Sequence, residues 1–186
     1  RRSETTVERD EEPDRCDLDK IRSMRPAFRR DGGTVTAASS SSISDGAAAL
    51  VLTGADTAAA RGIEPLARIV GHSGFAHEPA WFATAPVFAI RALQDRLGWT
   101  ADDVDLDEIN EAFAVGAMAA MHDLGLDHAK VNVNGGACAL GHQIGATGAR
   151  IIATLVHGLR SRGLRRGIAS LCIGGGEASA IAVEAL

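Results

Sequence analysis

The sequence is poor in aromatic side chains, and its acidic side chains outnumber its basic ones. It contains no tyrosine, only 4% aromatic residues, and a formal net charge of −5 at neutral pH. Proteins that bind nucleic acids stack bases on aromatic rings or present a surplus of lysine and arginine to the phosphates. We therefore expect no nucleic-acid partner.

Cysteine is scarce, and long apolar runs are missing. The three cysteines, Cys16, Cys138 and Cys172, show no CxxC spacing, which argues against a disulfide framework or a zinc site, so no metal is expected. No apolar run approaches the roughly 18–20 residues that a membrane helix requires. Residues 1–17 are charged throughout and hold no apolar signal segment, so we expect a cytoplasmic protein without membrane contact.

Charge is concentrated at the start of the chain. Residues 1–31 hold nine basic and nine acidic side chains, which are 18 of the 43 charged residues. Such a segment buries little apolar surface and is typical of an arm or a surface loop. After a run of four serines at 39–42, the apolar stretch AAALVLTG at 47–54 predicts a short buried strand that ends at a glycine.

Beyond residue 61, strand patterns and helix patterns alternate. The helical spacing of apolar residues predicts amphipathic helices at 85–98 and 145–163, and an alanine- and methionine-rich segment predicts a buried helix at 111–125. Short apolar segments predict five strands, at 64–71, 105–109, 130–133, 167–173 and 178–186. This alternation predicts an α/β fold in which helices cover a mixed five-stranded sheet.

One glycine-rich segment has a composition suited to catalysis. GGACALGHQIGATGAR, at 135–150, brings His142 close to the start of a helix. The positive end of a helix dipole disfavours an imidazolium, so it favours a neutral histidine that can act as a base. The alternative is a tight loop with an incidental histidine.

Two further segments follow predicted strands. LCIGGG, at 171–176, places Cys172 before glycines, and the amides of Gly174 and Gly175 are free to contact an oxyanion. NEAF, at 110–113, offers Asn110, which can hold a water or cap the helix that follows. A cysteine that fills the core and a simple helix cap are the alternatives.

These segments together resemble the thiolase family of acyl-CoA C-acyltransferases. NEAFA, NVNGGACALGHQIGATGAR and ASLCIGGGEASAIAVE match it in order and spacing, and RPAFRRDGGTVTAASSSSISDGAAALVL is similar to the stretch between the thiolase loop domain and core. The resemblance covers about residues 20–186. It implies a thiolase-like layered α/β/α C-terminal domain at 65–186, a remnant of the loop domain at 1–44, and a segment at 45–64 that belongs to the N-terminal half.

The resemblance also implies a reaction and roles for four residues. The reaction would be the cleavage of a 3-ketoacyl-CoA by CoA, or Claisen condensation of two acyl-CoA molecules, in lipid metabolism. His142 would activate a nucleophilic cysteine and stabilise the thioester-enolate oxygen, and Cys172 would move the α-proton. Asn110 would hold a water in one oxyanion hole, and the amide of Gly174 would contribute to a second.

Coenzyme A would enter as a substrate, with no other cofactor. By the same resemblance, Ser41, Ile43, Ala112 and Phe113 would line the pantetheine arm. Phe28, in RPAF, would contact the adenine end.

The nucleophilic cysteine has no match in this sequence. Thiolases carry it in their N-terminal half, in a motif like C-x-S-G, and neither Cys16 nor Cys138 fits that position. We therefore expect a C-terminal thiolase half whose apolar face is covered by a homo-oligomer or by a complementary N-terminal half. The alternative is a non-catalytic thiolase-like subunit that binds acyl-CoA or lipid, or that serves as a partner.

Three positions depart from the family pattern. Gln143 replaces a proline, which restores an N–H group and should loosen the turn after His142. Glu177 replaces an apolar residue and could raise the pKa of the Cys172 thiol by charge repulsion, or simply face solvent. A polar strand end can also lower a thiol pKa. The serine run replaces G-N-A-S-G, so Ser41 is matched by position alone.

Overall fold

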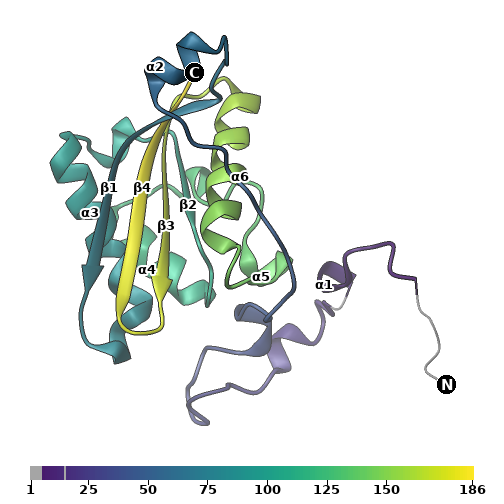
Figure 1. Cartoon of the computed structure of the whole chain (residues 1–186). Helices are drawn as coiled ribbons and strands as arrows, with labels where there is room; N and C mark the ends of the chain where they lie inside the picture. The colour runs from purple at the N-terminus through teal and green to yellow at the C-terminus, as the bar shows by residue number, and fades with distance from the viewer. Residues whose placement is uncertain (1–5, 15) are drawn as a thin grey trace.

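The computed structural model describes residues 6–14 and 16–186, which include a four-stranded mixed sheet (Figure 1). Its strand order is β1-β4-β3-β2, and the strands are β1 (Ala67–Ala76), β2 (Leu106–Ile109), β3 (Arg166–Ile173) and β4 (Glu177–Ala185). β4 pairs antiparallel with both β1 and β3, whereas β2 and β3 run parallel. The predicted α/β class is confirmed.

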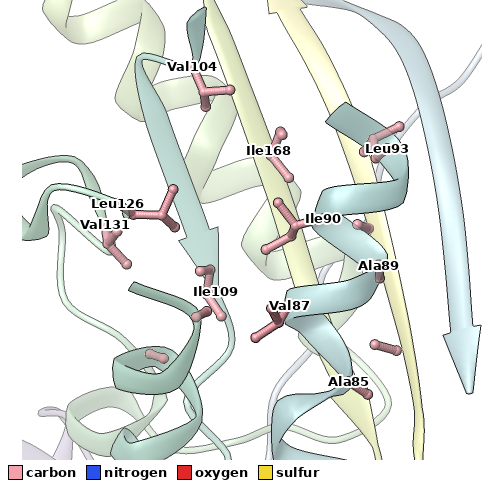
Figure 2. Packing of buried hydrophobic residues seen from close by; sticks show 14 of the residues in the cluster. Ala85, Val87, Ala89, Ile90, Leu93, Val104, Ile109, Leu126, Val131 and Ile168 are labelled. Atoms are coloured by element: carbon pink, nitrogen blue, oxygen red, sulfur yellow. The ribbon is translucent and has the colours of Figure 1, made fainter. Parts of the chain in front are cut away.

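Helices cover both faces of the sheet. α3 (Ala85–Leu97) and α4 (Ala114–Leu124) lie on one face, and α6 (Thr147–Arg162) lies on the other (Figure 1). Successive strand residues point to opposite faces, so Ile109 packs with α3 and α4 while Leu106 packs with α6. Two apolar cores result, and Figure 2 shows the one between the sheet and α3. The layers are therefore α/β/α, as the resemblance implied.

The predicted amphipathic helices are confirmed. Val87, Ile90 and Leu93 of α3 are almost fully buried. Ile151 and Leu155 of α6 are buried to the same degree. α3 and α4 end at Gly98 and Gly125, which take the left-handed conformation that ends many helices.

The fifth predicted strand, at 130–133, is wrong. Val131 forms only an isolated bridge with Asp107, and Asn132 has a positive φ of 49°. The Asn132 side chain takes the place of the next strand residue: its Oδ1 accepts from the Ile109 N–H and its Nδ2 donates to the Ile109 carbonyl, both at 2.8 Å. A side-chain amide thus pairs with the edge of β2 where a strand was expected.

The predicted strand at 47–54 is also wrong, because this segment has no regular secondary structure. Val51 is 96% exposed and Leu52 is 71% exposed. A strand needs a neighbour to pair its backbone groups, and the described residues provide none at this position. An apolar, extended segment is left on the surface.

The remaining elements are short. They are α1 (Glu11–Asp14), α2 (Ala55–Ala60), α5 (Ala137–Leu140) and the 3-10 turns η1 (Ile21–Ser23), η2 (Ala37–Ser39), η3 (Pro79–Thr84), η4 (Ala101–Asp103) and η5 (His128–Lys130). The described residues up to about 45 lie beyond one end of the strands, at the bottom of the view, and contribute no strand to the sheet (Figure 1). None of the helices in the described ranges has the length and apolar content that crossing a bilayer requires.

The face that carries α6 is only partly covered. A cavity of about 210 Å³ lies between α6 and strands β1, β3 and β4, lined in part by Ile152, Leu171 and Ile181. These side chains are half-buried. One helix does not cover four strands, so this face of the sheet has room for a further element.

Candidate active site

Three of the segments singled out in the sequence meet at one edge of the sheet. Asn110 follows β2, and its backbone N–H donates to the Ser170 carbonyl of β3 at 2.9 Å. Cys172 lies two residues further along β3, whose carboxyl end shares this edge because β2 and β3 are parallel. α6 begins beside the same edge, where Gly148 faces Leu171.

His142 is held by contacts on both its backbone and its ring. Its N–H donates to the Ser42 carbonyl at 2.8 Å, and its Nδ1 lies 2.8 Å from Oγ1 of Thr147. The Thr147 hydroxyl also donates to the Gln143 carbonyl at 3.1 Å. A carbonyl only accepts, so Thr147 uses its single hydrogen there and must accept from Nδ1. The proton of a neutral His142 therefore sits on Nδ1, and Nε2 carries the free lone pair.

The electrostatics of the site favour the neutral form of His142. Burial lowers the pKa of His142, and the nearby positive charge of Arg150 lowers it further. A neutral histidine was the expectation from the sequence, but the cause that the sequence suggested was the helix dipole. The causes found here are desolvation and an arginine that the sequence reading had missed.

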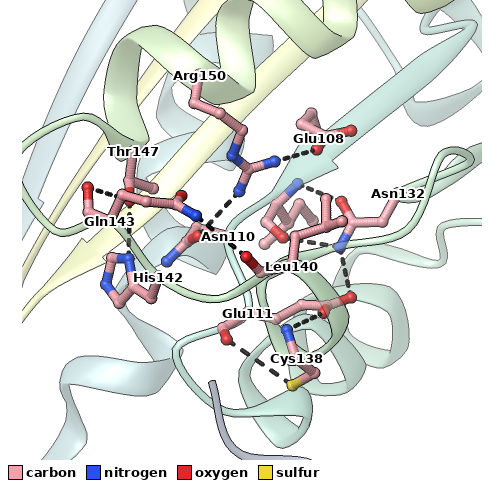
Figure 3. Close-up of polar contacts among 11 residues, drawn as sticks. Glu108, Asn110, Glu111, Asn132, Cys138, Leu140, His142, Gln143, Thr147 and Arg150 are labelled. Atoms are coloured by element: carbon pink, nitrogen blue, oxygen red, sulfur yellow. Dashed lines mark hydrogen bonds and ion pairs between the residues drawn. The ribbon is translucent and has the colours of Figure 1, made fainter. Parts of the chain in front are cut away.

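Arg150 connects the strand end to the helix (Figure 3). Its Nη1 lies 3.1 Å from Oε1 of Glu108, and its Nη2 lies 3.4 Å from Oδ1 of Asn110. Burial raises the pKa of Glu108 to about 7, and Arg150 opposes that rise. Nδ2 of Asn110 is buried and has no partner among the described residues. A signal for Arg150 existed in the sequence: a cation in the first turn of a helix opposes the dipole and needs a local reason.

Glu111 ties the glycine-rich loop to the strand end. Its Oε2 accepts from the Cys138 N–H at 3.1 Å, and its Oε1 accepts from Nδ2 of Asn132 at 2.9 Å (Figure 3). Asn132 in turn pairs with the backbone of Ile109. This side-chain scaffold, which the sequence reading also missed, fixes the path of the chain toward His142.

Gly136 has no side chain, and the Glu111 carboxylate occupies the space where a Cβ would lie. A Cβ at Gly136 would overlap both oxygens of that carboxylate. We expect Gly136→Ala to lower the free energy of unfolding by about 1–3 kcal/mol, since Glu111 must leave its two partners. Urea denaturation measures this, and Gly145→Ala on the same loop is the matched control, because a Cβ there meets no atom. Equal stability of the two variants would contradict the role assigned to Glu111.

The expectation that a strand end lowers the thiol pKa of Cys172 is wrong. Burial raises the pKa of Cys172, and Glu177 is exposed and is not a cause of the shift. Cys172 is half-buried at the end of β3, so desolvation of the thiolate dominates. Burial and Glu111 raise the pKa of Cys138 to about 11. Both thiols are therefore protonated near neutral pH.

The residues matched to a CoA site form one neighbourhood beside His142. The Ser41 hydroxyl donates to the Ala112 carbonyl at 3.0 Å, and Phe28 meets Phe113 edge to face with 5.6 Å between ring centroids. Ile43, which is 87% exposed, forms a backbone bridge with His142. The serine run thus packs against NEAF and against the histidine loop.

Gly174 lies in the turn between β3 and β4, where it is exposed. Its amide finds no hydrogen-bond partner within the described part of the chain. His142 and Asn110 are linked through Arg150, but no hydrogen bond among the described residues joins either of them to Cys172. Within the same residues, no group of three or more His, Cys, Asp or Glu side chains could hold a metal ion.

Gln143 does not loosen its turn. Its side-chain Nε2 donates to the Leu140 carbonyl at 3.1 Å. Its own carbonyl accepts from the N–H groups of Ala146 and Thr147. The turn after His142 is therefore closed by hydrogen bonds, one of them from a side-chain amide that a proline lacks.

Comparison with protein families gives two matches. The thiolase C-terminal domain matches residues 63–185, and the thiolase N-terminal domain matches residues 1–56. Residues 57–62, which include most of α2, lie between the two ranges.

Individual relatives point to the same family. Acetyl-CoA acetyltransferase 2 of Arabidopsis thaliana is 48% identical over 185 residues, which cover 100% of this chain to the nearest per cent and 46% of the relative. The crystal structure of the Bacillus anthracis acetyl-CoA acetyltransferase superposes with a TM-score of 0.93 at 48% identity, covering 100% of this chain and 47% of its own. The Acat5 thiolase of Ascaris suum, solved in complex with coenzyme A, gives 0.88 at 39% identity, covering 97% of this chain and 47% of its own. The chain spans about half the length of the proteins it matches.

Proposed function

Since the chain belongs to the thiolase family, we propose that it supplies the C-terminal catalytic residues of an acyl-CoA C-acyltransferase. The reaction is the thiolytic cleavage of a 3-ketoacyl-CoA, or the reverse Claisen condensation. The observation that carries this proposal is the sheet edge where Asn110 follows β2 and Cys172 lies near the end of β3, with His142 connected to Asn110 through Arg150. A subunit that only binds acyl-CoA has no need of Asn110, His142 and Cys172 together.

His142 acts on the nucleophile. Its free Nε2 takes the proton of a nucleophilic cysteine, which this sequence does not contain at a matching position. The resulting Nε2–H then donates to the thioester oxygen, where negative charge develops. Nδ2 of Asn110, which is buried and has no partner among the described residues, supplies a second donor, directly or through a water.

Cys172 acts as the acid and base at the α-carbon. When the bond between C2 and C3 of the 3-ketoacyl group breaks, the electron pair remains on C2 as a thioester enolate. The neutral Cys172 thiol gives that carbon its proton, and the thiolate later takes a proton from the attacking CoA thiol. A raised thiol pKa suits this step, because Cys172 must begin protonated. The exposed amide of Gly174 is the donor that we assign to the adjacent oxyanion.

Coenzyme A lies along Ser41, Ile43, Ala112 and Phe113 in this proposal, with Phe28 toward the adenine end. The contacts among these residues, and their position beside His142, support it. CoA enters as a substrate, and the residues named here need no further cofactor.

A complementary thiolase half completes the site. The exposed apolar segment 47–54 has no strand partner in the described part of the chain, and the face of the sheet beside α6 is partly open. Both features suit a second thiolase half that adds strands and helices here and brings the nucleophile to His142.

The test is to co-express the chain with the N-terminal half of the Bacillus anthracis relative and to follow CoA-dependent cleavage of acetoacetyl-CoA. We expect turnover by the pair and none by either half alone. Val51→Asp, on the exposed segment, should weaken the pairing, and Asp45→Asn is a surface control. A pair that associates but never turns over would reject the enzyme in favour of a non-catalytic acyl-CoA-binding subunit.

A further inference from the structure

Arg150 occupies a position that neither the reaction nor the fold requires by itself. It lies in the first turn of α6, its side chain is only 18% exposed, and its partner Glu108 is 5% exposed (Figure 3). Burying an ion pair gains little net stability over an apolar pair of similar size. The pair therefore calls for a reason other than stability.

The geometry around Asn110 gives that reason. A guanidinium has donors and no acceptor, so the Asn110 atom that faces Nη2 of Arg150 must be Oδ1. Nδ2 then points to the other side, where it is buried and has no partner among the described residues. The backbone of Asn110 is held separately by its bond to Ser170. Among the described residues, Arg150 alone bonds the side chain of Asn110 and so fixes which end of the amide faces the site.

We propose that Arg150 is a positioning residue that fixes the amide orientation of Asn110, so that Nδ2 and not Oδ1 faces the reacting carbonyl. This inference rests on the proposed function for its catalytic meaning. Without the arginine, the amide can turn about its terminal torsion and present an acceptor to a developing oxyanion. Glu108 holds the guanidinium in place through Nη1.

Arg150 also acts on His142 through its charge. It is a cause of the lowered pKa of that histidine, after burial. The two effects depend on different properties of the side chain: the forked guanidinium orients Asn110, whereas any cation would act on His142. Replacing Arg150 with lysine therefore separates the effect on Asn110 from the effect on His142.

The experiment uses three variants of the chain paired with the N-terminal half. Arg150→Lys keeps the positive charge but removes the planar guanidinium that bonds both Glu108 and Asn110. The double variant Arg150→Met with Glu108→Gln removes both charges, so that no buried ion is left alone. Arg162→Lys is the matched control, because Arg162 also lies on α6 and bonds the Oδ1 of an asparagine, Asn134, but is exposed at the far end of the helix.

We expect Arg150→Lys to lower kcat about 10- to 100-fold with KM within about twofold, since misplaced donors cost turnover rather than binding. NMR titration should give His142 the same midpoint in this variant and a higher midpoint in the double variant. Arg162→Lys should behave as wild type in both measurements. An Arg150→Lys enzyme with normal kcat would overturn the proposal.

A second readout separates this inference from the proposed function. In a ¹⁵N-labelled sample of the chain alone, the side-chain amide resonances of Asn110 should shift in Arg150→Lys and stay fixed in Arg162→Lys. If the wild-type pair is inactive, the proposed function fails, and this spectrum still decides the inference. Unchanged Asn110 amide resonances in Arg150→Lys would then overturn it.

Discussion

Replacing Cys172 with alanine is expected to lower kcat of the paired enzyme by about 10²- to 10⁴-fold, the usual contribution of a positioned acid or base. The thiol at the end of β3 is the group that we assign to proton transfer at the α-carbon. Alanine removes the proton without filling new space, so the free energy of unfolding should change little. Steady-state thiolysis of acetoacetyl-CoA, with urea denaturation of the same samples, measures both.

The other two cysteines are the controls. Cys16 is exposed in the N-terminal segment. Cys138 lies close to His142 in the sequence. Its hydrogen bond to Glu111, at 3.1 Å, is made by its backbone N–H, and an alanine at this position would keep that bond. Cys16→Ala and Cys138→Ala should therefore turn over at nearly the wild-type rate. An equal loss in Cys138→Ala would show that the two thiols had been assigned wrongly.

The pH profile follows from the same assignment. A base must be neutral, and the lowered pKa of His142 keeps it neutral below the usual range of histidine. An acid must be protonated, and the raised pKa of Cys172 keeps it protonated above the usual range of cysteine. The plateau of kcat against pH should be broad. Its acidic limb should lie at lower pH than the usual pKa of histidine, and its basic limb at higher pH than the usual pKa of cysteine.

Local patterns in the sequence were sufficient for the helices and for the position of the motifs. The spacing of Val87, Ile90 and Leu93 is enough to predict the buried face of α3, and Gly98 is enough to predict where the helix ends. Asn110 lies between β2 and α4, and His142 lies in the loop just before α6, as the positions of the motifs predicted. These features depend on neighbours in sequence, which is why a single chain suffices to predict them.

Features that depend on distant partners were missed. The strand expected at 130–133 gave way to the Asn132 side chain, whose bonds to Ile109 span 23 residues. Arg150 meets Glu108 across 42 residues, and no local pattern pairs them. The segment at 47–54 shows the converse case: its composition suits a strand, but pairing requires a neighbour outside the described residues. The direction of the Cys172 pKa shift likewise depends on burial, which composition does not give.

The chain also carries a buried carboxylate that has no role in the proposed reaction. Asp107 of β2 is 2% exposed, and its Oδ1 has no partner among the described residues. Burial raises the pKa of Asp107 to about 7, and the charge of Lys130 only partly opposes the rise. Between about pH 4 and pH 7 the unfolded chain has released this proton while the folded chain still holds it. Raising the pH through this window therefore favours unfolding.

Asp107→Asn removes that cost. We expect the variant to exceed wild type in the free energy of unfolding by about 4 kcal/mol at pH 8, because the pKa of about 7, which already includes the charge of Lys130, lies about three units above the usual value of an aspartate. The advantage should shrink as the pH falls and vanish near pH 4, where Asp107 is protonated in both states. Urea denaturation across this range measures the difference.

The difference between the two proteins isolates Asp107 from the other groups that titrate in the same window. Glu108, whose pKa also lies at about 7, is common to both and cancels. Asp102→Asn, in the exposed turn just before β2, changes the net charge by the same amount without burial and should leave stability unchanged across the range. A constant offset between Asp107→Asn and wild type from pH 4 to pH 8 would mean that Asp107 is ionised in the folded protein throughout. The charge of Lys130 would then have to offset the desolvation of Asp107 in full.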